Sequence, residues 1–392
     1  MKHSQCQPFN QIPSLAVLFT SFLRLGATAF GGPAMVAYIR KMAVEQKHWL
    51  EEESFRSGVA LCQTIPGATA MQTAAYVGLR ARGTLGAIAS FVGFGLPAFL
   101  LMMTLSALYV QTRRLSPVVS TFSGLQAIVV AIVAKATVSF GRTSLKKWQD
   151  GLIAIVAACM FGLKVSPILV ILLAALSALV LYNRQPIGQS KVDSKKKPYP
   201  LRNLLWLLSF AVIGFALLLL LNRKLFLLAA LMSRIDLFAF GGGYASIPLM
   251  FHEIVEVRSW MDASTFLNGI ALGQVTPGPI VITATFVGYL LNGLLGGLIA
   301  TVAVFLPSFL MVVAIVPYFD KLRASARFNK AIGGILCSFV GLLLSVTIRF
   351  GLNVPWDLPR AFLTSATFIA LSLNVDILWV VLIGSVISVA VL

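Results

Sequence analysis

The stretch TLGAIASFVGFGLPAFLLMMTLSALY, residues 84–109, contains no charged side chain and decides the class of fold. It is longer than the roughly 18 residues that a helix needs to cross about 30 Å of hydrocarbon. Residues 204–221 form another such stretch, and only 11% of the chain is charged, against about 25% in soluble domains. Continuous apolar stretches exclude a membrane β-barrel, whose strands alternate in polarity. The sequence therefore predicts an all-α polytopic membrane protein.

The charge and the cysteines exclude several functions. The net charge is +18, but the basic residues stand singly or in short groups between apolar spans, so the expected partner is a lipid bilayer and not nucleic acid. Cys6, Cys62, Cys159 and Cys337 lie far apart without metal-ligand spacing, so no metal and no cofactor are expected. The sequence has no Walker A, G-x-S-x-G or H-E-x-x-H motif, and we do not expect an enzyme.

The chain repeats itself at an interval of 210 or 211 residues. Phe30-Gly31-Gly32 recurs as Phe240-Gly241-Gly242, and the segment from Gln63 to Pro66-Gly67 recurs from Gln274 to Pro277-Gly278. Further matching pairs are Arg24 and Arg234, Trp49 and Trp260, Gly83 and Gly293, Pro97 and Pro307, and Gly124 and Gly334. Two copies of one unit therefore make up nearly the whole protein.

Each copy contains about six apolar helical elements. In the first copy we expect them at residues 14–39, 57–79, 84–109, 117–140, 148–164 and 165–182. The predicted organisation is an N-terminal repeat at 1–182, a basic linker at 183–203, an extra transmembrane helix at 204–221 and a C-terminal repeat at 222–392. If the first copy crosses the membrane an even number of times, the one extra helix makes the second copy start on the opposite side of the membrane from the first. We therefore predict two inverted-topology repeats.

The distribution of basic residues supports this topology. If the linker is cytoplasmic, fifteen Lys and Arg residues of the short connections fall on its side of the membrane and seven on the other, as the positive-inside rule requires. The N-terminus and the linker are then both cytoplasmic. The element interrupted at Pro66-Gly67 either crosses the membrane as a broken helix or enters and leaves as a hairpin, and the sequence leaves both topologies open.

The duplicated Pro-Gly breaks are the first candidate site. A helix that restarts after such a break points free N–H groups and its positive dipole end toward its start, which suits an anion. Irregular backbone is tolerated in a membrane only inside protein or beside a water-filled cavity. Gln63 and Gln274 precede the breaks, and each amide either donates to an oxyanion or caps the broken backbone. The Phe-Gly-Gly segments are either close-packing points or unwound hinges.

Four charged residues in apolar elements complete the candidate set. Arg24 and Arg234 lie inside apolar runs, where an unpaired cation is costly, so each either attracts an anion or has a structural partner such as Asp236 for Arg234. Proton coupling would need an acid that loads and unloads, and the candidates are Asp236 and Glu253. Asp236 corresponds to Gly26 in the first copy, so coupling through it would be asymmetric.

The order and spacing of these motifs resemble the chromate ion transporter family in its long two-domain form. The resemblance covers about residues 24–124 and 234–334 and includes a late Gly-x3-Pro-x-Phe, from Gly93 to Phe99. It implies a secondary active transporter that exports chromate across the cell inner (plasma) membrane, with chromate resistance as the outcome and sulfate as a competitor. The family motifs fall on Phe30, Gly31, Gly32, Gln63, Pro66 and Gly67, and on Phe240, Gly241, Gly242, Gln274, Pro277, Gly278 and Pro279.

The sequence departs from the family pattern at one position and leaves two questions open. Ala68 stands where the family usually has a second Pro, so the first half either binds less tightly or serves structure. A tetrahedral dianion with four acceptor oxygens suits Arg, amide and helix N-terminal donors, but sulfate or another oxyanion fits equally well. A carrier that imports such an anion is therefore the alternative, and a homodimer is left open as an assembly.

Overall fold

The structure is a computed structural model that describes residues 12–30, 33–182, 201–319 and 325–392. Within these ranges the regular elements are helices, without strands. The first repeat contains α1 (Leu15–Thr28), α2 (Pro33–Arg40), the π-helix η1 (Lys41–Gln46), α3 (Glu52–Thr64), α4 (Thr69–Thr112), α5 (Ser116–Ser144), α6 (Trp148–Gly162) and α7 (Pro167–Leu181). The helix α8 (Leu201–Leu221) precedes the second repeat.

The second repeat has the same order of helices as the first. Its elements are α9 (Arg223–Phe238), η2 (Gly243–Ala245), α10 (Ser246–Phe251), η3 (His252–Val257), α11 (Ala263–Val275), η4 (Ile280–Ile282), α12 (Thr283–Ile315), η5 (Val316–Tyr318), α14 (Ala326–Asn353), α15 (Leu358–Ser372) and α16 (Ile377–Val391). The backbone conformation is repeated as well. The non-glycine residues with positive φ occur in repeat-related pairs, His48 with Ser259 and Lys164 with Asn374.

The Pro-Gly breaks form helical hairpins. Gly58 in α3 lies under the ring of Tyr76 in α4, so closely that a Cβ on the glycine would meet the ring at 2.1 Å. Gly269 in α11 lies under Phe286 in α12 in the same way, at 2.4 Å. Positions equally far before and after the break therefore touch, which requires antiparallel arms. The segment around each Pro-Gly break is therefore a helical hairpin and not a single broken helix.

Each hairpin continues through a second sharp bend into a long helix. In α4 the bend lies at Arg82 and Gly83, where Gly83 has φ +66°, and α12 repeats it at Gly293, with φ +59°. Before and after the first bend, Gly78 and Gly86 approach so closely that a Cβ on Gly78 would lie 2.2 Å from the Gly86 carbonyl oxygen. Glycine is required here because no side chain fits between the two arms.

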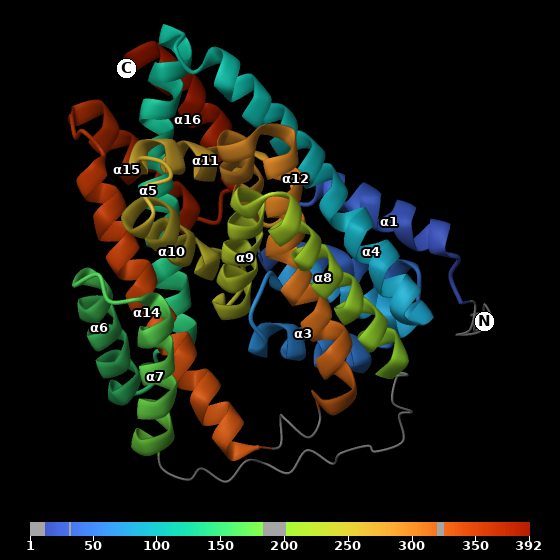
Figure 1. Ribbon diagram of the computed structural model, residues 1–392. Coiled ribbons are helices and arrows are strands. Elements are labelled where there is room, and N and C mark those ends of the chain that lie inside the picture. The colour runs from blue at the N-terminus through green and yellow to red at the C-terminus, as the bar shows by residue number, and fades with distance from the viewer. Residues whose placement is uncertain (1–11, 31–32, 183–200, 320–324) are drawn as a thin grey trace, which may run out of the picture.

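The two repeats are inverted relative to each other. The corresponding helices α5 and α14 cross at Thr137 and Thr347, equivalent residues whose hydroxyl oxygens lie 3.2 Å apart. Gly141, four residues later in α5, faces Val340, seven residues earlier in α14, so the helices run antiparallel. The prediction of two inverted repeats is confirmed. In Figure 1 the related pairs α6/α7 and α15/α16 accordingly lie at opposite ends of the molecule.

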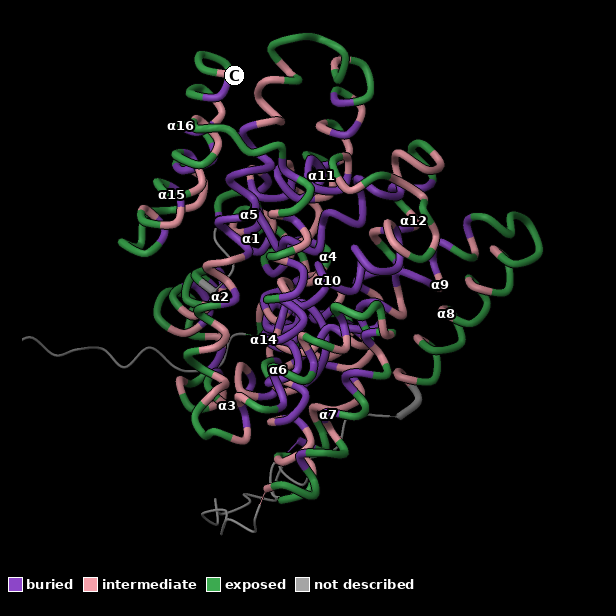
Figure 2. Tube along the Cα trace, turned by 90° about the vertical axis from the view of Figure 1, so that its left-hand side faces the viewer, coloured by how far each residue is buried: buried purple, intermediate pink, exposed green. Residues whose placement is uncertain are grey.

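The repeats exchange their last two helices. α6 and α7 pack on α14 of the second repeat, and α15 and α16 pack on α5 of the first. Small residues permit this contact on both sides, because Gly124 lies against Ser388 and its repeat equivalent Gly334 lies against Ala178. The central segments of α5 and α14 are therefore buried on all sides, whereas α8 lies exposed at the margin (Figure 2).

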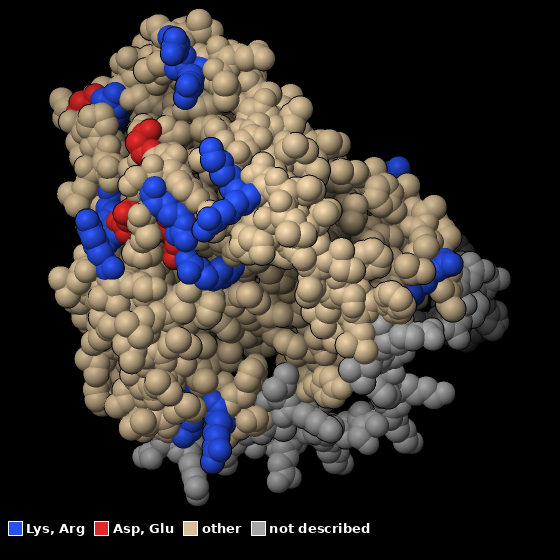
Figure 3. All heavy atoms as spheres, viewed as in Figure 1, with Lys and Arg blue, Asp and Glu red and all other residues tan. Residues whose placement is uncertain are grey.

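Five of the described helices are long and apolar enough to cross a membrane, namely α4, α5, the 203–221 part of α8, the 280–318 region and α14. α6, α7, α15 and α16 have 15 residues each, about 22 Å of helix, which is shorter than a straight crossing. The face in Figure 3 is largely uncharged, and Lys and Arg outnumber Asp and Glu on it. These features are those of a multi-pass helical membrane protein.

Candidate functional site

Each hairpin tip donates a backbone hydrogen bond to the other repeat. The N–H of Gly67 donates to the carbonyl of Ala239 at 2.9 Å, and the N–H of Gly278 donates to the carbonyl of Ala29 at 3.1 Å. Ala29 and Ala239 are the residues just before the two Phe-Gly-Gly segments. Each Pro-Gly tip is therefore held by the broken first helix of the other repeat, a contact that neither repeat can make alone.

The local sequence explains why each tip leaves backbone donors free. Pro66 interrupts the helix, Gly67 turns at φ +116° and Gly278 turns at φ +115°, a region that glycine adopts without strain. α4 then begins at Thr69 behind Ala68, which offers no side-chain acceptor to the first N–H groups of the helix. The helix that starts at Ile280 follows Pro279, which offers none either. Both helices thus begin with uncapped positive ends.

A cavity of about 1300 Å³ opens between the two tips. At its inner end lie residues of both tips and of the second Phe-Gly-Gly segment: Phe30, Gln63, Ala68, Thr69, Ala70, Gly241, Gly242, Gly243, Tyr244, Gly273, Gln274, Thr276, Gly278, Pro279 and Ile280. Gly242 and Thr69 are close neighbours, because a Cβ on Gly242 would lie 3.2 Å from the Thr69 hydroxyl oxygen. The lining at this end carries hydroxyl, amide and backbone groups and no carboxylate.

Gln274 carries the most informative atom of the cavity. In the described part of the chain, two buried side-chain atoms have no hydrogen-bond partner, Oε1 of Gln72 and Nε2 of Gln274. Gln274 is 9% exposed, and leaving a buried N–H without an acceptor costs about 1–3 kcal/mol. Its counterpart Gln63 is exposed. Gln274 lies beside the Tyr244 side chain, but its Nε2 has no hydrogen bond of good geometry, so this amide can donate to a ligand beside the tip of the second hairpin.

The mouth of the cavity is basic. The charged residues there are Arg40, Arg56, Lys146, Lys147 and Lys330 against Glu52 and Asp150. Glu52 pairs with Arg40 and Arg56, and the hydrogen bond from Arg40 holds the pKa of Glu52 below its usual range. Asp150 accepts from the backbone N–H groups of Lys146 and Lys147, at 2.9 Å each. The net positive charge that remains attracts anions into the cavity.

The cavity opens on one side of the hairpin tips and is closed on the other. Tyr182 and Lys330 mark the open end. On the other side Gln126 of α5 donates to Ser264 at 2.7 Å and to Asn268 at 2.9 Å, and Asn268 donates to the Tyr109 hydroxyl at 3.0 Å. We call Gln126, Asn268 and Tyr109 the closed-side network.

Inverted symmetry makes the difference between the two ends informative. The repeat equivalent of Gln126 is Leu336, which lines the open cavity. The structure therefore holds related surfaces together on one side of the tips and apart on the other. This asymmetry within a symmetric fold is typical of one state of an alternating-access cycle.

The predicted Phe-Gly-Gly and Pro-Gly residues occupy different parts of this arrangement. Gly241 and Gly242 both have φ +96° and line the cavity, so this segment is an unwound break after α9. Gly31 and Gly32 fall outside the described residues. Phe240 packs partly buried against the core. Pro66, Gly67 and Pro277 form the tips without lining the cavity.

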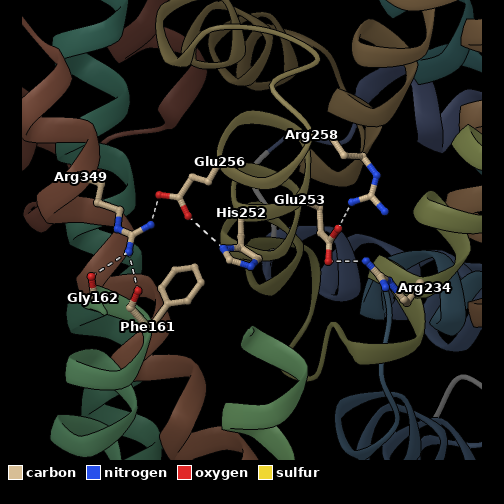
Figure 4. A network of polar contacts seen from close by, with 8 residues as sticks. All are labelled: Phe161, Gly162, Arg234, His252, Glu253, Glu256, Arg258 and Arg349. Carbon is tan, nitrogen blue, oxygen red and sulfur yellow. Dashed lines mark hydrogen bonds and ion pairs between the residues drawn. The ribbon is translucent and has the colours of Figure 1, made fainter. Parts of the chain in front are cut away.

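The two predicted arginines do not reach the cavity. The side chain of Arg24 is exposed on α1. Arg234 pairs with Glu253, and Glu253 also binds Arg258 (Figure 4). The structural partner of Arg234 is therefore Glu253 and not Asp236. Asp236 instead accepts hydrogen bonds from the backbone N–H and the hydroxyl of Ser308, at 2.7 to 2.9 Å.

A second ion-pair group lies beside the first and escaped the sequence analysis. Arg349 of α14 binds Glu256 and the carbonyl of Phe161 at the end of α6, and Glu256 contacts His252 Nδ1 at 2.9 Å (Figure 4). It joins the second repeat to α6 of the first. Its residues lie on three elements far apart in the sequence, so no spacing pattern could have revealed it.

Several cavity residues also lacked a sequence signal. Thr69 and Tyr244 are adjacent to the duplicated motifs and could have been found by extending them by two residues. Phe140 and Leu336 are apolar residues of long helices, and Lys146 and Lys330 belong to different repeats. Nothing local distinguishes these residues from others of the same kind. Packing of α6 and α7 on α14 of the second repeat brings Lys146 and Lys330 to one mouth.

Inverted helical repeats whose broken elements meet at an open cavity define a class, the membrane transport proteins. The model of the chromate transporter family matches residues 16–179 and 225–389. The chain belongs to this family, as the motifs indicated.

Individual relatives agree with this assignment. The chain is 44% identical to an uncharacterised transporter of Methanocaldococcus jannaschii over 96% of this chain and 94% of that protein. It is 31% identical to the chromate transport protein of Cupriavidus metallidurans, over 90% of this chain and 87% of that protein. It is also 31% identical to a probable chromate transport protein of Synechococcus elongatus, over 88% and 87%. No solved structure matches the chain.

Proposed function

We propose that the protein is a secondary active carrier that binds chromate between the two hairpin tips and exports it across the cell inner membrane, with sulfate as a competitor. The unpartnered Gln274 Nε2 is the observation that carries the proposal. Together with the uncapped start of α4 it offers hydrogen-bond donors from two sides, and the inner lining has no carboxylate to repel an anion. An oxyanion with four acceptor oxygens satisfies such donors.

The proposed binding residues are those residues of the duplicated motifs that line the cavity. They are Phe30, Gln63, Gly241, Gly242, Gln274, Gly278 and Pro279, joined by Thr69. Pro66, Gly67 and Pro277 shape the tips that present the donors. Arg24 and Arg234 are left out of the binding site, because one is exposed on α1 and the other is paired with Glu253. The basic mouth serves to concentrate the anion.

The side on which the cavity opens supports export as the proposed direction. The mouth carries Lys146, Lys147 and Lys330, and the positive-inside rule assigns such a basic side to the cytoplasm. A site that opens to the cytoplasm can load an anion for export. The membrane potential, negative inside, favours outward movement of a dianion. Chromate resistance is the expected consequence in the cell.

The alternative function is a carrier for sulfate or another oxyanion that imports its substrate. The donor set recognises charge and tetrahedral shape and contains nothing specific to chromium. Relatives named for chromate favour chromate as the first substrate to test.

The test is flux in liposomes that contain the purified protein. We expect saturable chromate uptake that excess sulfate inhibits, and we expect Gln274→Leu to reduce it at least tenfold. Gln111→Leu, at an exposed position near the end of α4, is the matched control and should transport normally. Absence of flux for chromate and sulfate in the wild type would refute an oxyanion carrier. Flux of sulfate alone would leave the alternative.

A further inference from the structure

Asp236 is a fully buried carboxylate without a cation partner among the described residues. On its own helix, Arg234 is engaged by Glu253. The elements packed against α9 add no opposite charge, since α10 and α12 contain no Asp, Glu, Lys or Arg, and neither do residues 203–221 of α8. An ionised carboxylate in such surroundings is stabilised by hydrogen bonds alone, and a carboxylate inside a membrane protein is a candidate proton carrier.

Asp236 lies directly behind the tip of the first hairpin. The Ser308 hydroxyl that it binds is so close to Gly67 that a Cβ on this glycine would lie 1.8 Å from the oxygen. The N–H of Gly67 donates to Ala239, three residues after Asp236. Ala68, the next residue after Gly67, begins the stretch that lines the cavity. One hydroxyl and one glycine therefore separate the carboxylate from the proposed anion donors.

The second tip has no such group. The equivalents of Asp236 and Ser308 are Gly26 and Ala98, and a Cβ on Gly278 would meet the methyl group of Ala98 at 2.8 Å. The two repeats are therefore unequal: the first hairpin tip has a carboxylate behind it, and the second tip has a glycine at the equivalent position. Glu253, the other coupling candidate, is bound by two arginines and does not line the cavity.

We propose that Asp236 takes up one proton when an oxyanion binds at the first hairpin tip. The inference rests on the proposed oxyanion site. A dianion at the start of α4 repels the negative carboxylate, so protonation to the neutral acid and anion binding favour each other. The proton comes from water and no other bond changes. By linkage, each ligand raises the affinity for the other by the same factor.

A structural role must be distinguished from this one. Pro307 leaves the carbonyl of Ala303 without its helical donor, and the Ser233 hydroxyl donates to it at 2.9 Å. Asp236, one turn later, holds Ser308 just after the same proline. A purely structural brace would affect folding and stability but would not bind a proton with the substrate.

The experiment is calorimetric titration of the purified full chain with sulfate, a dianion throughout the neutral range, in buffers of different ionisation enthalpy. We expect the wild type to take up nearly one proton per sulfate at the upper end of that range, and its Kd to fall by up to tenfold per unit decrease in pH. Asp236→Asn should bind sulfate without proton uptake and without pH dependence. Asp357→Asn, which keeps an exposed helix cap, should behave as the wild type.

Other outcomes separate the hypotheses. Sulfate binding by the wild type without proton uptake would overturn the role of Asp236 and leave the carrier intact, and so would undiminished uptake in Asp236→Asn. If this variant does not fold, Ser308→Ala decides, because loss of one hydrogen bond to the charged carboxylate should move the pH profile to higher pH. An unmoved profile refutes the proposal. No binding of sulfate, or of chromate at alkaline pH, would refute the proposed function first.

Discussion

Gln274→Leu tests the proposed site most directly, because the affinity for the oxyanion should fall while the stability of the unliganded protein should not. Nε2 of Gln274 is buried without an acceptor. Hydrogen bonds to charged groups contribute about 1.5–3 kcal/mol, and 1.4 kcal/mol corresponds to tenfold. Loss of this donor should therefore weaken oxyanion binding by about 10- to 150-fold. The unliganded protein loses only an unsatisfied group, so its thermal stability should not fall.

The assays are calorimetric binding and thermal unfolding of the purified variant, with and without chromate. Gln63→Leu is an internal comparison, because Gln63 occupies the equivalent position but is exposed. It should weaken binding by less than about fivefold, since an exposed donor gains little net energy. A Gln274→Leu variant with lower unliganded stability and wild-type affinity would show that the amide supports the fold, and the argument for the site would fail.

Three further predictions address the tips, the gate and the ion pairs. Gly67→Ala should lower stability by about 2–5 kcal/mol, because backbone strain adds to overpacking against Ser308. Gly83→Ala, with open space around it, should cost only the backbone strain, about 1–3 kcal/mol. Equal unfolding shifts would contradict this. Asn268→Ala removes two hydrogen bonds of the closed-side network, so thiol labelling of Leu336→Cys in the cavity should slow as the opposite side opens. Unchanged labelling would exclude a gating role. Arg349→Gln removes the arginine partner of Glu256 and leaves it only the contact with His252. It should destabilise the fold by about 3 kcal/mol, and a thermal scan that matches the wild type would refute this.

The sequence by itself determined the class of fold and the pairing of its motifs. Uninterrupted apolar stretches such as residues 84–109 can satisfy their backbone in lipid only as helices. The repetition of Phe-Gly-Gly and Pro-Gly at one interval identified two related units, and the basic residues predict their orientation in the membrane. These signals are local or periodic, so a single amino-acid sequence is enough to detect them.

Tertiary structure decided which charged residues share a site. Arg24 and Arg234 had the sequence character of anion ligands, yet one is exposed and the other is neutralised by Glu253. The choice between a crossing and a hairpin at Pro66-Gly67 also depended on packing, because it is the contact of Gly58 with Tyr76 that folds the arms together. The reciprocal bonds from Gly67 to Ala239 and from Gly278 to Ala29 join residues of different repeats. Such contacts arise only when the inverted halves interlock, and no local pattern encodes them.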